Sequence, residues 1–183
     1  MAGRSVGVFG SSEPVAGLPA YEEARRLGAL LARAGARVVN GGYGGVMEAA
    51  SRGAREAGGE ALGVTCSFFA ERAPNPWLTE IVPSGDLFER TRLLIDLSDA
   101  FIILPGKSGT IAELAFLWAL DRARMLGGKP VVLCGPIWPA LLDAIERAGS
   151  IEPAQRRISL LCPTVEGAVD LLVERMAGER EKD

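Results

Sequence analysis

The sequence predicts an α/β fold in which helices cover both faces of a mostly parallel β-sheet. The chain has 183 residues, the length of a single domain, and its 48% apolar and 23% charged residues are typical of a globular protein. Short apolar runs alternate with longer segments in which apolar residues recur at helical spacing. Strands that are apolar on both sides are typical of a parallel sheet buried between helices. We expect one domain over residues 1–178, followed by a solvated tail at 179–183.

Each strand is predicted from an apolar run, and each helix from the 3.6-residue spacing of its apolar side chains. The first run, SVGVF, ends at a Gly-Ser-Ser turn, and the first helical segment ends at Gly35. Residues 66–77 contain Pro74 and Pro76 and are expected to be irregular. The strands are expected at residues 5–9, 37–40, 61–65, 78–82, 100–104, 130–133 and 158–161. The helices are expected at residues 20–34, 46–57, 86–97, 108–125, 139–147 and 165–176.

Composition excludes several classes of protein. The net charge is −3, so we expect no nucleic-acid partner. The chain has no His, which excludes a Ser-His-Asp triad and most zinc and haem sites. Cys66, Cys134 and Cys162 form no CxxC motif and are expected to be reduced. Without an apolar run of membrane-spanning length or a signal-peptide pattern, we expect a cytoplasmic protein with no membrane partner.

Three predicted strands end in loops rich in glycine and serine that lead into helices: residues 10–12, 41–45 and 105–110. The carboxyl ends of parallel strands meet at one edge of the sheet, where ligands bind. A glycine-rich loop before a helix suits a phosphate group, because it offers unpaired N–H groups and the positive end of the helix dipole. Any one loop could be a tight turn only, but three together favour a nucleotide or phosphate site. The residues expected to bind it are Gly10, Ser11, Gly41, Gly42, Gly44, Gly45, Gly106, Lys107, Ser108, Gly109 and Thr110.

Two common phosphate-binding motifs are absent from these loops. A Walker A motif ending at Gly106-Lys107-Ser108 would need Gly at position 101, which is Phe101. A dinucleotide fingerprint starting at Gly42 would need Gly at position 47, which is Met47. A conventional ATPase or NAD-dependent dehydrogenase is therefore not expected.

Two charged side chains near these loops have both a functional and a structural interpretation. Glu113 is a candidate catalytic carboxylate at the start of a helix, but Thr110-x-x-Glu113 also has the pattern of a capping box. Arg90 is a candidate ligand-binding cation, but it is also spaced to pair with Asp86 on one helix. Lys107 has little packing reason to occupy a glycine-rich loop.

Residues from Val6 to about Pro130 resemble the Lonely Guy (LOG) family, which also carries the label "possible lysine decarboxylase". The matching segments are VFGSS at 8–12, GGYGGVMEAA at 41–50, ERTRLLIDLSDAFIILPG at 89–106 and PGKSGTIAE at 105–113. The last resembles the family motif PGGxGTxxE. Pyridoxal phosphate chemistry needs a Schiff-base lysine, and only Lys107 lies near the expected site, so we reject lysine decarboxylation.

The resemblance implies a Rossmann-like homodimer that cleaves the N-glycosidic bond of nucleoside 5′-monophosphates. The products are a free base and ribose 5-phosphate, and AMP and cytokinin nucleotides are the usual substrates. By motif, Glu113 matches the catalytic glutamate and Arg90 the functional arginine, while Gly109 and Thr110 match the phosphate-binding turn. This chemistry requires no metal or other cofactor, and none is expected.

The chain departs from the family pattern at three positions. Lys107 replaces the second glycine of PGG, Ser108 stands where an aromatic residue is common, and Thr91 replaces a lysine. These changes leave an alternative open. The chain could instead be a non-catalytic protein of the same superfamily that binds or carries a nucleotide or the molybdenum cofactor.

Overall fold

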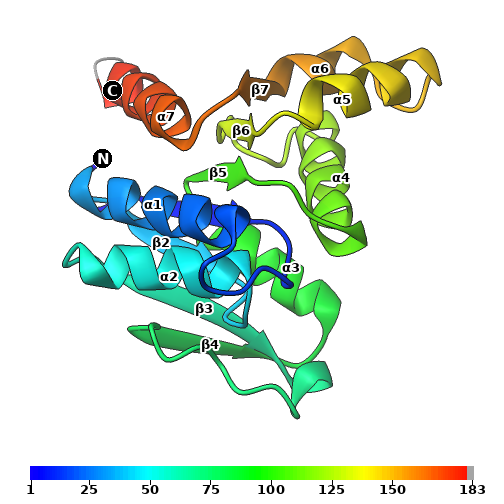
Figure 1. Cartoon of the computed structure of the whole chain (residues 1–183). Helices are drawn as coiled ribbons and strands as arrows, with labels where there is room; N and C mark the ends of the chain where they lie inside the picture. Colours follow the sequence, from blue (N-terminus) through cyan, green and yellow to red (C-terminus); the bar gives the residue numbers. More distant parts are fainter. Residues whose placement is uncertain (181–183) are drawn as a thin grey trace.

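The computed structural model describes residues 1–180, which form one seven-stranded sheet with helices on both sides (Figure 1). The strand order is β4-β3-β2-β1-β5-β6-β7, and every pairing within the sheet is parallel. The strands are β1 (Ser5–Phe9), β2 (Arg37–Asn40), β3 (Ala61–Cys66), β4 (Glu80–Ser84), β5 (Ala100–Ile103), β6 (Val131–Cys134) and β7 (Ser159–Cys162). The predicted Rossmann-like α/β fold is confirmed.

Seven α-helices and one short 3₁₀ helix, Ser67–Phe69, connect or follow the strands within the described residues. The α-helices are α1 (Pro19–Arg33), α2 (Val46–Glu56), α3 (Leu87–Asp96), α4 (Ser108–Arg122), α5 (Trp138–Arg147), α6 (Pro153–Ile158) and α7 (Val165–Arg180). Helix α6 was not predicted, because six residues are too few to show a helical period. Helix α7 continues through Arg180, into the segment expected as a tail, and residues 181–183 lie outside the described part of the chain.

Alternate residues of the strands face two separate hydrophobic cores. On one face, Val6, Val38 and Ile102 pack with buried residues of α1, α2 and α7. On the other face, Phe101 and Ile103 pack with buried residues of α3, α4 and α5. This arrangement gives the three layers that continuous apolar strands predict.

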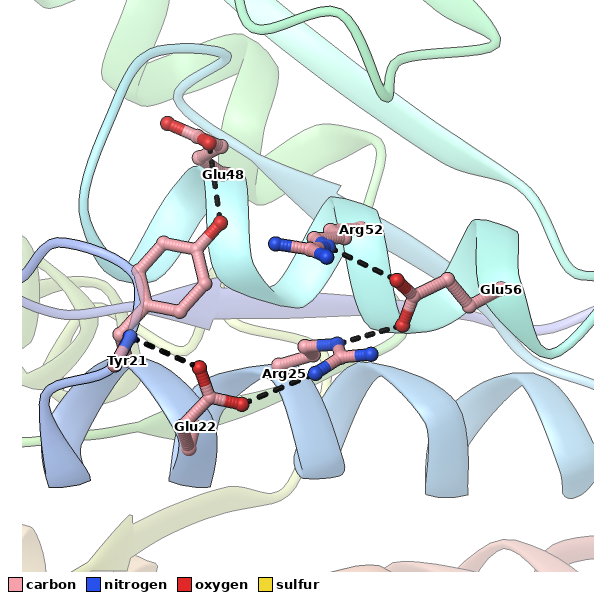
Figure 2. Close-up of polar contacts among 7 residues, drawn as sticks. Tyr21, Glu22, Arg25, Glu48, Arg52 and Glu56 are labelled. Carbon is pink, nitrogen blue, oxygen red and sulfur yellow. Dashed lines mark hydrogen bonds and ion pairs between the residues drawn. The ribbon is translucent and has the colours of Figure 1, made fainter.

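Helices α1 and α2 are held together by polar contacts across their outer surface (Figure 2). Arg25 Nε on α1 donates to Glu56 on α2 at 2.6 Å, and Arg52 Nε donates to the same carboxylate at 2.9 Å. These two bonds lower the pKa of the Glu56 carboxyl. The Tyr21 hydroxyl donates to Glu48 at 3.0 Å. Helix α2, which starts directly after the second glycine-rich loop, is therefore fixed against α1.

No helix among residues 1–180 is both long enough and apolar enough to cross a membrane.

Candidate active site

A cavity of ≈ 190 Å³ lies at the carboxyl ends of β1 and β5. These two strands are neighbours at the centre of the sheet, where the chain order reverses between β2-β1 and β5-β6. Their loops are joined by a hydrogen bond of 3.2 Å from the Ser11 N–H to the carbonyl of Pro105. In open α/β sheets, ligands bind at this kind of switch point.

Seven of the thirteen residues predicted for the site line this cavity: Gly10, Ser11, Arg90, Lys107, Gly109, Thr110 and Glu113. The other six do not line it: Gly41, Gly42, Gly44, Gly45, Gly106 and Ser108. Five further residues complete the wall without having been predicted: Ser12, Tyr43, Met47, Phe69 and Arg72.

The amino-terminal end of α4 forms one side of the cavity and is suited to an anion. The N–H groups of Ser108, Gly109 and Thr110 have no hydrogen-bond partner among residues 1–180. The Thr110 hydroxyl also has none, although Thr110 is only 4% exposed. Unpaired N–H groups and the positive end of the helix dipole together favour a phosphate group here.

Lys107 immediately precedes α4 and adds a positive charge to the same side. Its Nζ lies 2.6 Å from Glu13, and both side chains are exposed. The backbone at Lys107 has φ −98°, so this position does not require the glycine of the family motif. Lys107 therefore fits the loop without backbone strain.

Arg90, on α3, is anchored by strand β3 and by the loop that follows β2. Its Nε donates to the carbonyl of Val64 at 2.9 Å, and its Nη2 donates to the carbonyl of Gly41 at 3.0 Å. Its Nη1 has no partner among the described residues and so remains able to bind a ligand. The predicted alternative, a pair with Asp86, is wrong, because Asp86 caps α3 by accepting from the N–H groups of Phe88 and Glu89.

The Glu113 carboxylate, on the second turn of α4, is partly buried in the cavity wall. Burial raises the pKa of this carboxyl to about 7, against the opposing effect of the positive charge of Arg90. The capping-box interpretation of Glu113 is wrong. Helix α4 starts at Ser108 rather than after Thr110, and its N-cap residue, Lys107, makes no side-chain capping bond. Glu113 makes no hydrogen bond within residues 1–180 that would explain its position structurally.

The glycines of the loop at 41–45 support the site from outside the cavity. A Cβ on Gly41 would overlap Nη2 of Arg90, so Gly41 leaves the space that the guanidinium occupies. Gly45 has φ +70° and lies against the backbone of Ser11 and Ser12, next to a hydrogen bond of 2.8 Å from the Val46 N–H to the carbonyl of Ser11. This loop therefore positions Arg90 and the first loop.

Tyr43 and Phe69 form an aromatic part of the wall that was not predicted. Their rings meet edge to face, with centroids 5.6 Å apart. The Tyr43 hydroxyl accepts from the N–H of Cys66 at 2.9 Å, which fixes the ring against the end of β3. Phe69 and Arg72 come from the irregular segment 66–77, whose sequence has no recognisable motif. The sequence signal that could have identified Tyr43 as a site residue is its position as an aromatic residue inside a glycine-rich loop.

The sequence model of the SLOG cluster4 family matches residues 3–146 of this chain. This chain belongs to the SLOG cluster4 family. A cytokinin riboside 5′-monophosphate phosphoribohydrolase of Rhodococcoides fascians is 35% identical over 175 residues, which cover 91% of this SLOG protein and 87% of that relative. A probable enzyme of the same name from Oryza sativa subsp. japonica is 34% identical over 178 residues, covering 92% and 70% of the two chains. The resemblance to the LOG family is thus confirmed.

Solved structures of the same fold include a molybdenum cofactor binding protein from Rippkaea orientalis. It aligns with a TM-score of 0.75 and covers 94% of this SLOG protein and 97% of its own chain. At 24% identity, the likeness shows a shared fold.

A second cavity of the SLOG protein, ≈ 460 Å³ in volume, lies at the opposite, amino-terminal edge of the sheet. The arginines that line it, Arg4 and Arg37, are paired with Asp99 and Glu80. Among the described residues, this second cavity therefore lacks a cation without a carboxylate partner, such as Arg90 in the first cavity. Residues 1–180 contain no cluster of side chains suited to a metal ion.

Proposed function

We propose that this SLOG protein is a nucleoside 5′-monophosphate phosphoribohydrolase acting on AMP or a cytokinin-type nucleotide. Water would add to C1′ of the ribose, and the C1′–N bond would break with its electron pair leaving on the base nitrogen. The water would lose one proton, and the base nitrogen would take up one proton. The products would be the free base and ribose 5-phosphate. The observation that carries the proposal is Glu113, a carboxylate with a raised pKa in the same cavity as a helix end whose N–H groups are unpaired.

The phosphate of the substrate would bind at the start of α4. The unpaired N–H groups of Ser108, Gly109 and Thr110 would donate to its oxygens, with the Thr110 hydroxyl and Lys107 beside them. Arg90 would hold the nucleotide through Nη1, since its other nitrogens are occupied by backbone carbonyls. Fixing both ends of the sugar phosphate would bring C1′ to the carboxylate.

Glu113 would stabilise the positive charge that develops on the ribosyl ring as the base leaves, and would orient the attacking water. A carboxylate with a pKa of about 7 is also able to accept the proton of that water near neutral pH. The sequence match to the glutamate of the LOG motif supports the same role.

The test is incubation with AMP and a panel of nucleoside 5′-monophosphates, with free base measured by chromatography. We expect base release by the wild-type protein, none by Glu113→Gln, and unchanged release by Glu60→Gln, whose carboxylate lies at the opposite edge of the sheet. Glu113→Gln should still bind AMP. Binding of AMP by the wild-type protein without base release would reject the hydrolase and favour the non-catalytic binding or carrier function.

We also propose that the protein is a homodimer, with α3 and α4 at the interface. The exposed apolar side chains Phe88, Phe116 and Met125 line a surface depression of ≈ 640 Å³ there. Beside them, Arg92 and Asp96 form an exposed ion pair of 3.1 Å, so the patch carries both charges and is able to match a second copy of itself. Light scattering should give twice the monomer mass, and Phe88→Glu should reduce it to the monomer mass. Val15→Glu, a change at another exposed apolar residue, should leave it unchanged.

A further inference from the structure

The cavity has two chemically different sides. The start of α4 carries unpaired N–H groups and Lys107, whereas the opposite part of the wall comes from Tyr43, Met47 and Phe69. Phosphate binding accounts for the first side only. The aromatic side requires a ligand group of another kind.

Phe69 is held in the cavity wall with part of its ring accessible. Its edge-to-face contacts with Tyr43 and Phe68 have centroid separations of 5.6 Å each, so the ring is supported by its neighbours. A supported, partly exposed aromatic ring beside a phosphate site is suited to stack on a nucleobase.

Arg72 covers the same ring but is weakly held. Its guanidinium carbon lies 5.1 Å from the centroid of Phe69. The side chain is exposed and has no carboxylate or hydrogen-bond partner among residues 1–180. A cation–π contact at an exposed site is weak. An incoming planar group would therefore displace this guanidinium at little cost.

Arg90 differs from Arg72 in how firmly its guanidinium is held. It also lies near the ring, 5.9 Å from the centroid, but two backbone carbonyls fix it. The structure thus provides one fixed and one movable guanidinium beside a single aromatic ring. The fixed Arg90 is able to keep the sugar phosphate in place, and the movable Arg72 is able to close over a planar group that stacks on the Phe69 ring.

We infer that Phe69 and Arg72 form the base-recognition site, in which the base stacks on Phe69 and the Arg72 guanidinium moves from the ring to cover the outer face of the base. Guanidinium planes stack on nucleobases, so the base would be held on both faces. A purine offers the larger surface for this arrangement. The site therefore takes purine nucleotides in preference to pyrimidine nucleotides. This inference rests on the proposed function but concerns binding rather than bond cleavage.

The test compares dissociation constants for AMP, UMP and ribose 5-phosphate, measured by calorimetry. Phe69→Ala should weaken AMP binding roughly ten- to a hundredfold and remove the preference for AMP over UMP, while binding of ribose 5-phosphate stays within about twofold. Phe69→Trp should restore tight AMP binding. Trp77→Ala is the matched control in the same irregular segment and should change neither affinity, because Trp77 does not line the cavity and its ring lies under Arg52 instead.

Arg72→Ala should weaken AMP binding several-fold and leave ribose 5-phosphate unaffected. Equal weakening of both ligands would show that Arg72 binds the phosphate, and would overturn its role at the base. Equal weakening of both by Phe69→Ala would show a merely structural role for the ring and would overturn the inference.

The same measurements separate this inference from the proposed function. AMP binding that depends on Phe69, without base release, would reject the hydrolase and keep the base site. Base release whose KM and kcat are both unchanged by Phe69→Ala would support the hydrolase and reject the base site. A wild-type protein that binds neither AMP nor ribose 5-phosphate would reject both.

Discussion

Arg90 Nη2 donates a hydrogen bond of 3.0 Å to the carbonyl of Gly41, and the missing side chain of Gly41 provides the space for it. The two residues are 49 positions apart in sequence: Gly41 lies in the loop after β2, and Arg90 lies in the first turn of α3. This contact links the second glycine-rich loop, which does not line the cavity, to a side chain that does.

Gly41→Ala should therefore reduce activity through Arg90. The added Cβ would displace the guanidinium, and a shift of about 1 Å in a substrate-positioning group costs up to roughly a hundredfold in rate. The measurement is kcat/KM for base release from AMP. Gly44→Ala is the matched control in the same loop, because its Cβ would meet nothing closer than 3.8 Å. Equal losses in the two variants would point to a general distortion of the loop instead.

Activity should rise with pH as Glu113 ionises. If the carboxylate form stabilises the ribosyl cation and accepts a proton from water, kcat/KM should increase through a pKa of about 7 and then level. The measurement is kcat/KM for AMP between pH 5.5 and 8.5. A rate that falls across this range would mean that the protonated carboxyl acts as an acid.

Lys107 should contribute to phosphate binding far more than to stability. Its ion pair with Glu13 is exposed, so Lys107→Gly should change the free energy of unfolding by less than about 1 kcal/mol. The same variant should weaken ribose 5-phosphate binding several-fold and make it less sensitive to salt. Glu13→Gln should act in the opposite direction, because it frees Lys107 for the ligand. Unchanged affinity in both variants would remove Lys107 from the phosphate site.

The three thiols should differ sharply in reactivity. Cys66 and Cys134 are buried, and burial raises the pKa of the Cys134 thiol to about 12, so almost no thiolate forms there at neutral pH. Cys162 is partly exposed. Alkylation of the native protein, followed by mass spectrometry, should label Cys162 first, and denaturant should release the other two. Fast labelling of Cys134 in native protein would contradict its burial.

Sequence patterns were sufficient for the fold because its strands are continuous apolar runs and glycines mark the element boundaries. Strand β1 begins and ends where predicted, at Ser5 and Phe9. Helix α6 was missed because it is too short for a period. Strand β4 lies two residues later than expected and contains Pro83, which an edge strand tolerates.

The site was predictable in part, for a physical reason. Lys107, Gly109, Thr110 and Glu113 belong to one contiguous loop and helix end, so their proximity follows from local sequence. Phe69 reaches the cavity through an irregular segment that no periodic pattern places. Spacing alone left the structural alternatives for Glu113 and Arg90 open. The absence of a side-chain capping bond at the start of α4 and the hydrogen bonds of Asp86 decide against them.

Glu113 should also make the stability of the protein pH-dependent. Its pKa is about 7 in the folded chain and 4.5 for an unperturbed Glu, so between these pH values the folded state holds a proton that the unfolded state has lost. Stability should consequently fall as pH rises across that interval, by up to about 3 kcal/mol from this residue. Glu113→Gln carries no charge and removes this contribution. Urea unfolding should thus show the variant matching wild type near pH 4 and exceeding it in stability at pH 8. Parallel curves for the two proteins would mean that the carboxylate is well solvated in the folded state, and a less stable variant at pH 8 would mean that it is held by a structural partner.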